Sequence, residues 1–194
     1  MADLNPTDEA LMAQVREGDL RKLAILFERH HRRVFNFFVH MCGDRDMSED
    51  LAQEVFFRML RYRSGYDEKR PFAAWMYQIA RNLNTDRMQR RKGELQLVPV
   101  DAEDEFAVHE PRSGEMDAEE ALRKRQEIEL LQRALNRLPG DKREILVLSR
   151  FQDLKYEEIA HILGCEIGAV KVRVYRAVRA LGEMYRELAG ERAS

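Results

Sequence analysis

Apolar residues recur at helical spacing along most of this 194-residue chain, and runs with the alternation of a strand are nearly absent. The first such stripe, typical of a helix with one buried face, contains Leu20, Leu23, Ala24, Phe27, Val34, Phe38 and Met41. The helical pattern stops at 93–114, a stretch with two prolines, two glycines and many acids. We therefore predict an all-α fold with two small helical domains, an N-terminal helical bundle at 20–92 and a C-terminal domain at 120–190, joined by an acidic linker at 93–119.

The segment that follows "GDRDMSED" carries apolar residues on two sides. Ser48 is the predicted N-cap, with acids in the first turn where the helix dipole favours them. One face of this helix contains Leu51, Val55, Met59 and Tyr62, and roughly the opposite face contains Gln53, Phe56, Phe57 and Leu60. A helix in a small domain needs only one buried face. Two interpretations remain open: the helix is buried on all sides, or its second face docks onto another protein.

The segment "FAAWMYQIARNLNTDRMQRRK" predicts a third helix of the N-terminal domain, with Asn82 at the edge of its apolar face. That face contains Phe72, Trp75, Met76, Ile79 and Leu83, and the basic residues behind it are Arg81, Arg87, Arg90, Arg91 and Lys92. Cations near a helix C-terminus suit the helix dipole, so a solvated end is one interpretation. Interleaved aromatic and basic residues also fit a surface that binds a nucleic-acid backbone and stacks bases.

The C-terminal domain ends in a helix, a glycine turn and a second helix. Before them, Asp141 and Glu144 have the spacing of a capping box, and Gly164 suits a left-handed turn position. The second helix has a buried seam of Val170, Val174, Ala177 and Leu181, and the opposite face carries Lys171, Val172, Tyr175, Arg176 and Arg179. That face has no acid, whereas a merely solvated face usually mixes Glu with Lys. The pattern predicts a helix-turn-helix whose second helix lies in the major groove of DNA.

The distribution of charge supports contact with nucleic acid, although the net charge is only −2. Residues 61–92 carry a net +6, residues 93–120 a net −9 and residues 121–194 a net +4. Cys42 and Cys165 lie far apart, which is typical of reduced thiols in a cytoplasmic protein. We expect no signal peptide, no membrane insertion, no metal site and no cofactor. No phosphate-binding glycine loop or nucleophile elbow is present, so we expect no enzymatic activity.

With these segments in place, the chain resembles bacterial RNA polymerase sigma factors of the extracytoplasmic-function (ECF) type, in the sigma-70 superfamily. "SEDLAQEVFFRML" is similar to the segment that docks on the β′ clamp helices, which implies that Asp50, Gln53, Phe56 and Leu60 bind polymerase. "FAAWMYQIARNLNTDRMQRRK" resembles the −10 recognition segment. The loop at 64–71 corresponds to one that helps to hold a flipped-out base, and Asn82 matches a base-contacting position. "LKYEEIAHILGCEIGAVKVRVYRAVRAL" resembles the −35-reading helix-turn-helix.

The resemblance implies an alternative sigma factor that binds core RNA polymerase at the β′ clamp helices and the β flap, recognises promoter DNA and promotes its melting. It also implies an anti-sigma factor as a partner, and a linker that threads through the polymerase cleft.

The sequence departs from the family pattern at two positions that affect these expectations. Lys155 replaces a common Ser or Thr cap, so the helix start is expected to be frayed or differently capped. Val172 replaces a common Ser, which alters the reading face. The alternative, a free-standing helix-turn-helix regulator, leaves the two-faced helix and the aromatic, basic segment unexplained.

Overall fold

The computed structural model describes residues 6–95 and 118–193, with side chains at 6–89 and 120–191. The N-terminal half contains α1 (Asp8–Arg16), α2 (Arg21–Cys42), α3 (Arg45–Arg61), the short 3₁₀ turn η1 (Arg63–Gly65) and α4 (Phe72–Leu95). The C-terminal half contains α5 (Ala118–Arg137), α6 (Gly140–Leu146), the π-helical turn η2 (Val147–Phe151), α7 (Tyr156–Leu163) and α8 (Ile167–Ala193). Within these ranges there is no strand, and the predicted all-α fold is confirmed. Most of the predicted acidic linker, residues 96–117, lies outside the described residues, and the domain boundaries stay predictions.

Helix α1 precedes residue 20, where we expected the N-terminal domain to begin. Its side chains Leu11, Met12 and Val15 are fully buried, so α1 belongs to the core of the N-terminal half. Thr7 is its N-cap, and the hydroxyl of Thr7 accepts a hydrogen bond of 3.2 Å from the amide of Ala10. A Thr cap, acids in the first turn and apolar residues at helical spacing are all visible in the sequence, and the prediction overlooked them.

The predicted start of α3 is wrong, because Asp44 rather than Ser48 caps the helix. The side chain of Asp44 accepts a hydrogen bond of 3.0 Å from the amide of Met47, so the helix begins at Arg45. Ser48 lies inside the first turns, fully buried, and its hydroxyl donates to the carbonyl of Asp44. Both residue types are good caps, and the one that directly follows the left-handed Gly43 takes the position.

Two further helix starts depart from a simple capping box. Pro139 is the N-cap of α6, and Glu144 pairs with Arg81 of α4 instead of capping its own helix, so the predicted Asp141–Glu144 box is wrong. At α7, the carboxylate of Glu158 accepts a hydrogen bond of 2.8 Å from the backbone amide of Lys155. This helix is therefore differently capped, which was one of the two expected outcomes. Gly164 takes the left-handed conformation predicted for the turn before α8, with φ 61°.

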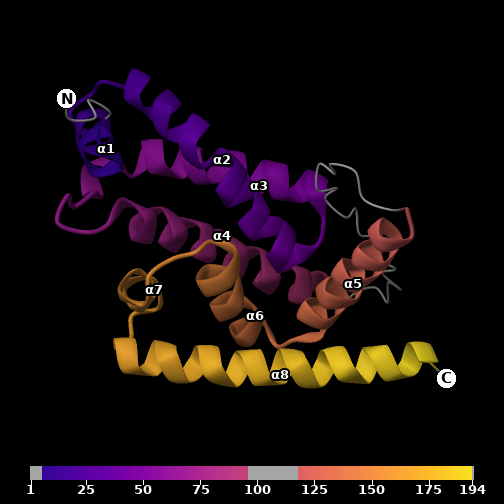
Figure 1. The fold of residues 1–194 in the computed structure, drawn as a ribbon. Coiled ribbons are helices and arrows are strands. Elements are labelled where there is room, and N and C mark those ends of the chain that lie inside the picture. Colours follow the sequence, from indigo (N-terminus) through magenta and orange to yellow (C-terminus); the bar gives the residue numbers. More distant parts are fainter. Residues whose placement is uncertain (1–5, 96–117, 194) are drawn as a thin grey trace, which may run out of the picture.

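Helix α4 lies between the two halves and packs on both (Figure 1). Helices α2 and α3 cover it on one side, while α6 and α7 approach it on the other. A single apolar core runs through both halves and includes Phe37 and Tyr77 from the N-terminal half and Leu148 and Ile159 from the C-terminal half. Helix α8 runs along the outer edge of the molecule, where its last turns pack against α5 through Leu188.

The buried polar centre of the contact between the halves is a hydrogen bond of 2.7 Å between the hydroxyl of Tyr77 and the side-chain amide of Gln152. Both residues are almost fully buried, with exposed fractions of 2% and 1%. Nearby, a nitrogen of Arg143 donates to the carbonyl of Met41 over 2.8 Å, and the ring of His40 lies 4.1 Å from that of Phe151. The two predicted domains therefore form one packed body.

We predict that Asp44→Ala lowers the free energy of unfolding by about 1 kcal/mol, because the first turn of α3 loses its cap. Asp46→Ala removes an exposed acid from the same turn and should change this free energy by less than about 0.5 kcal/mol. Urea denaturation of the two variants and the unchanged protein measures both values. Equal losses would show that charge near the helix start matters and the capping bond does not.

Candidate nucleic-acid and protein-docking surfaces

The predicted reading face of α8 is exposed over its whole length. Lys171, Val172, Tyr175, Arg176 and Arg179 are all exposed, whereas the opposite seam of Val170, Val174 and Ala177 is buried. Val172 and Tyr175 keep 48% and 64% of their surface in contact with solvent. The ion pair of Arg179 with Glu183, at 3.9 Å between two exposed side chains, is weak. The face thus combines exposed cations with exposed apolar and aromatic groups, a combination that suits the major groove of DNA.

The predicted reading residues of α4 have mixed environments. Asn82 is exposed and Arg87 is half-buried, while the side chain of Arg90 lies outside the described side chains. On the predicted apolar face, Phe72, Met76 and Leu83 are buried and Trp75 and Ile79 are half-buried. The sequence interpretation missed the second buried face of α4, which contains Tyr77 and Ala80.

The predicted docking face of α3 differs from the expectation at one residue. Phe56 was expected to project outward, but it is only 5% exposed, with its ring 4.9 Å from that of Phe27 on α2. The neighbouring Phe57 is 59% exposed. Asp50 and Gln53 are exposed and Leu60 is half-buried. The second apolar face exists, therefore, but Phe57 is its exposed aromatic residue, because α2 crosses α3 at Phe56.

A cavity of about 380 Å³ lies between the two predicted reading helices. Arg81, the neighbour of Asn82 on α4, lines it together with Arg173 and Arg176 of α8. In its lining, Nε of Arg81 donates to the carboxylate of Glu144, with distances of 3.1 and 3.2 Å to the two oxygens. Burial raises the pKa of Glu144, and the charge of Arg81 partly opposes that rise. The structure therefore places Arg81, the neighbour of Asn82, and Arg176, a predicted reading residue of α8, in the lining of one cavity.

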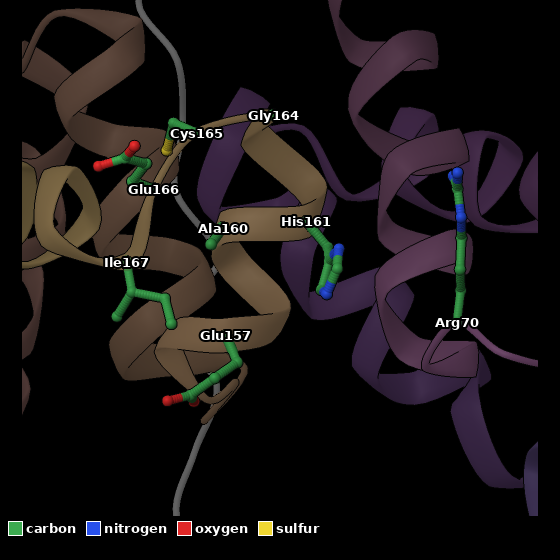
Figure 2. A pocket seen from close by; sticks show the side chains of 8 residues that line it. All are labelled: Arg70, Glu157, Ala160, His161, Gly164, Cys165, Glu166 and Ile167. Carbon is green, nitrogen blue, oxygen red and sulfur yellow. The ribbon is translucent and has the colours of Figure 1, made fainter.

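A second, more open hollow of about 860 Å³ separates the loop before α4 from the helix-turn-helix. Figure 2 shows Arg70, from that loop, across the hollow from His161 on α7. The turn residues Gly164, Cys165 and Glu166 complete the far wall. The loop predicted to hold a base and the turn of the helix-turn-helix thus line the same hollow.

Three histidines of α2 have local partners. His30 pairs with Asp8 at 2.6 Å and His31 with Glu49 at 2.9 Å, while His40 contacts Gln132 at 3.3 Å and has its pKa lowered by burial. Among the described residues, no three His, Cys, Asp or Glu side chains are grouped in a way that could hold a metal ion. In the same part of the chain, every helix is too short or too polar to cross a membrane.

Comparison with known proteins gives two family matches in the order that the segments predict. Residues 26–94 match the model for sigma-70 region 2, and residues 128–181 match the model for sigma-70 region 4. RNA polymerase sigma factor CarQ of Myxococcus xanthus is 30% identical over 177 residues, which cover 91% of this chain and 97% of CarQ. RNA polymerase sigma-H factor of Pseudomonas aeruginosa is 29% identical over 186 residues, covering 95% of this chain and 96% of that one.

Solved structures show the same fold. The sigma factor RpoE of Bartonella quintana, in complex with the anti-sigma factor NepR, has a TM-score of 0.68 and 25% identity, and the match covers 86% of this chain and 98% of that one. CnrH, in complex with the cytosolic domain of CnrY, has a TM-score of 0.67 and 23% identity, over 93% of this chain and 97% of that one. This chain belongs to the ECF sigma factors of the sigma-70 family. It is therefore an alternative sigma factor, a protein that initiates transcription with RNA polymerase.

The adjacent phenylalanines of α3 make a matched pair for testing the docking face. Phe56→Ala should lower the free energy of unfolding by about 3–5 kcal/mol, because it removes a buried ring from beneath α2. Phe57→Ala should change it by less than about 0.5 kcal/mol but weaken binding to core RNA polymerase about fivefold or more, as loss of an interface anchor does. Urea denaturation and titration of labelled protein with core enzyme give the two values. Unchanged core affinity of Phe57→Ala would remove this residue from the docking face.

Proposed function

We propose that the region 2 half of this protein opens promoter DNA at the −10 element and that the helix-turn-helix reads the −35 element, as parts of an RNA polymerase holoenzyme. The observation that carries this proposal is the exposed face of α8 from Lys171 to Arg179, which contains no acid, in a chain that matches region 2 and region 4 in order. The protein acts in the cytoplasm, where RNA polymerase works, and contributes binding rather than catalysis. A free-standing regulator would leave the exposed α3 face without a use.

Run-off transcription with core RNA polymerase on a library of promoters tests this function. We expect transcripts only when this protein is added, from promoters that share two short elements. A lack of transcripts with a core enzyme that is active with another sigma factor would contradict it. Tight binding of the free protein to a palindromic duplex would instead favour the regulator.

In the −35 complex, Arg176 and Val172 contact base edges, and Lys171, Tyr175 and Arg179 mainly contact phosphates. In the −10 complex, Asn82 contacts an extruded base, while Arg87 and Arg90 bind the backbone near it. The exposure of Asn82 and of the α8 face supports these roles. Asp50, Gln53 and Leu60 bind the β′ clamp helices, with Phe57 as the aromatic anchor in place of the buried Phe56.

Two arginines one turn apart on α8 should separate base reading from phosphate binding. In the holoenzyme, Arg176→Ala should lower affinity for the selected −35 sequence by about 1–3 kcal/mol and flatten the preference between sequences. Arg179→Ala should weaken binding to all sequences alike. It should also reduce the slope of the logarithm of affinity against the logarithm of salt concentration by about one. Competition between duplexes at two salt concentrations measures both. A uniform loss for Arg176→Ala would mean that the reading face is assigned wrongly.

The described arrangement is a closed form that cannot engage a whole promoter. The −35 and −10 elements lie about 25 base pairs apart, which is about 85 Å at about 3.4 Å per base pair. Here Arg81, next to Asn82, and Arg176 line the same cavity. The two halves must therefore separate before both elements can be read. An anti-sigma factor, like the partner of the related RpoE, would act by favouring such an inactive form.

Separation of the halves should be measurable as a change in energy transfer between dyes on Glu28 of α2 and Glu187 of α8, both exposed. We expect high transfer for the free protein and a large fall on addition of core polymerase. Gln152→Ala should lower the transfer of the free protein, because it leaves the Tyr77 hydroxyl buried without its partner. Glu183→Ala, on the exposed side of α8, serves as the control. Equal transfer with and without core polymerase would contradict the closed form.

A further inference from the structure

Helix α1 lies before residue 26, where the match to sigma-70 region 2 begins. It packs beside the loop that joins α3 to α4 (Figure 1). In that loop, residues 64–70 are exposed with the exception of Tyr66, which is only 3% exposed. Such a loop contains little apolar surface to hold its shape, so its conformation depends on a few polar contacts.

The first of these contacts is at the base of the loop. A carboxylate oxygen of Glu9, on α1, accepts a hydrogen bond of 3.0 Å from the backbone amide of Phe72. Phe72 is the first residue of α4, and an amide at that position has no acceptor within its own helix. Glu9 therefore caps α4 from a different helix, and its negative charge also suits the positive end of the α4 dipole.

The second contact is within the loop itself. One terminal nitrogen of Arg16, at the end of α1, donates to the carbonyl of Tyr66 over 3.2 Å, and the other contacts the carboxylate of Glu68. The guanidinium group is planar and rigid, so its two nitrogens hold these two points at a defined separation. The ring of Tyr66 lies 5.0 Å from that of Trp75, which fixes the same point of the loop from the side of α4.

Helix α1 is itself firmly attached, so it can act as a fixed support. Asp8 accepts a hydrogen bond of 2.7 Å from Arg29 and pairs with His30 at 2.6 Å, both on α2. The apolar side of α1 is fully buried at Leu11, Met12 and Val15. The contacts made by Glu9 and Arg16 therefore connect the loop to the core of the N-terminal half.

We propose that α1 is a positioning element for promoter opening, in which Glu9 and Arg16 hold the loop at 64–71 in the shape that receives the extruded −10 base. This proposal rests on the proposed opening of the −10 element and on the base-holding role that the family resemblance implies for the loop. Extrusion of a base from a duplex is unfavourable, and ordering a loose loop at the same time adds an entropic penalty. A loop that is already ordered avoids this penalty, as preorganised binding sites do. Neither residue touches DNA in this proposal.

The experiment uses the holoenzyme and a promoter selected by the unchanged protein, with 2-aminopurine placed at each −10 position in turn. The fluorescence of this base rises when it leaves the stack, so it reports extrusion directly. We expect Glu9→Ala and Arg16→Ala to slow the rise at the extruded position about tenfold. Affinities for core polymerase and for the −35 duplex should stay unchanged. Glu17→Ala and Arg21→Ala, exposed residues of like charge nearby, are the matched controls.

Conservative variants separate positioning from general damage. Glu9→Gln keeps an oxygen that can accept the bond from Phe72, so it should restore most of the extrusion rate. Arg16→Lys can reach only one of the two loop contacts and should be intermediate. Normal rates for both alanine variants would overturn the proposal. An equal loss for Glu9→Gln and Glu9→Ala would do the same, as would a parallel fall in core affinity, which would point to a folding defect.

Asn82→Ala distinguishes a failure of this inference from a failure of the proposed function. If Asn82→Ala slows extrusion but the α1 variants do not, α1 has no positioning role and the −10 site stands. If Asn82→Ala and the α1 variants all leave the fluorescence change intact, the −10 site itself is assigned wrongly and the inference falls with it.

Discussion

The structure depends on α4, a helix that must bury two faces at once. One face completes the core beneath α2 and α3, and the other packs against α7 and bonds Gln152, in the turn between η2 and α7, through the hydroxyl of Tyr77. A buried hydroxyl and a buried amide are each unfavourable without a partner, so this pair couples the two halves strongly and specifies their register. Since α4 also carries Asn82, the helix that joins the halves is the helix that would read DNA.

This double role explains why buried polar groups collect at the seam. Glu144 is largely withdrawn from water beside Arg81, and Arg143 reaches across to a backbone carbonyl of α2. Replacing such groups by apolar ones of similar volume would hold the halves together more tightly, because buried charges carry a desolvation penalty that apolar groups do not. Polar contacts that are satisfied only in the closed form can be exchanged for water or polymerase when the halves separate. The seam is thus suited to the separation of the halves that we propose for promoter binding.

In the N-terminal half, the exposed loop before α4 and the helix that holds it are separate elements. The loop before α4 is exposed and has few apolar contacts, which leaves it accessible to a base. Its shape comes from the neighbouring helix α1, which supplies Glu9 to the start of α4 and Arg16 to the loop backbone. Exposed loops usually lack the contacts that would hold one conformation. Here α1, a helix outside the loop whose apolar side is buried, supplies those contacts.

The sequence by itself determined the helical class, the glycine turn and the exposed face of α8, since these follow from local periodicity and from the conformational freedom of one glycine. It also determined the family, because the two motifs occur in order along the chain. Only the tertiary structure decided which of Phe56 and Phe57 is buried, since both lie near the second face of α3 and the crossing of α2 selects one. It likewise decided that Asp44 rather than Ser48 caps α3, and that Glu144 pairs with Arg81 rather than its own helix. The sequence also did not predict that the two halves pack together through Tyr77. These outcomes depend on contacts between residues far apart in the chain, such as that of Arg81 with Glu144. The periodicity of apolar residues within one helix gives no information about such contacts.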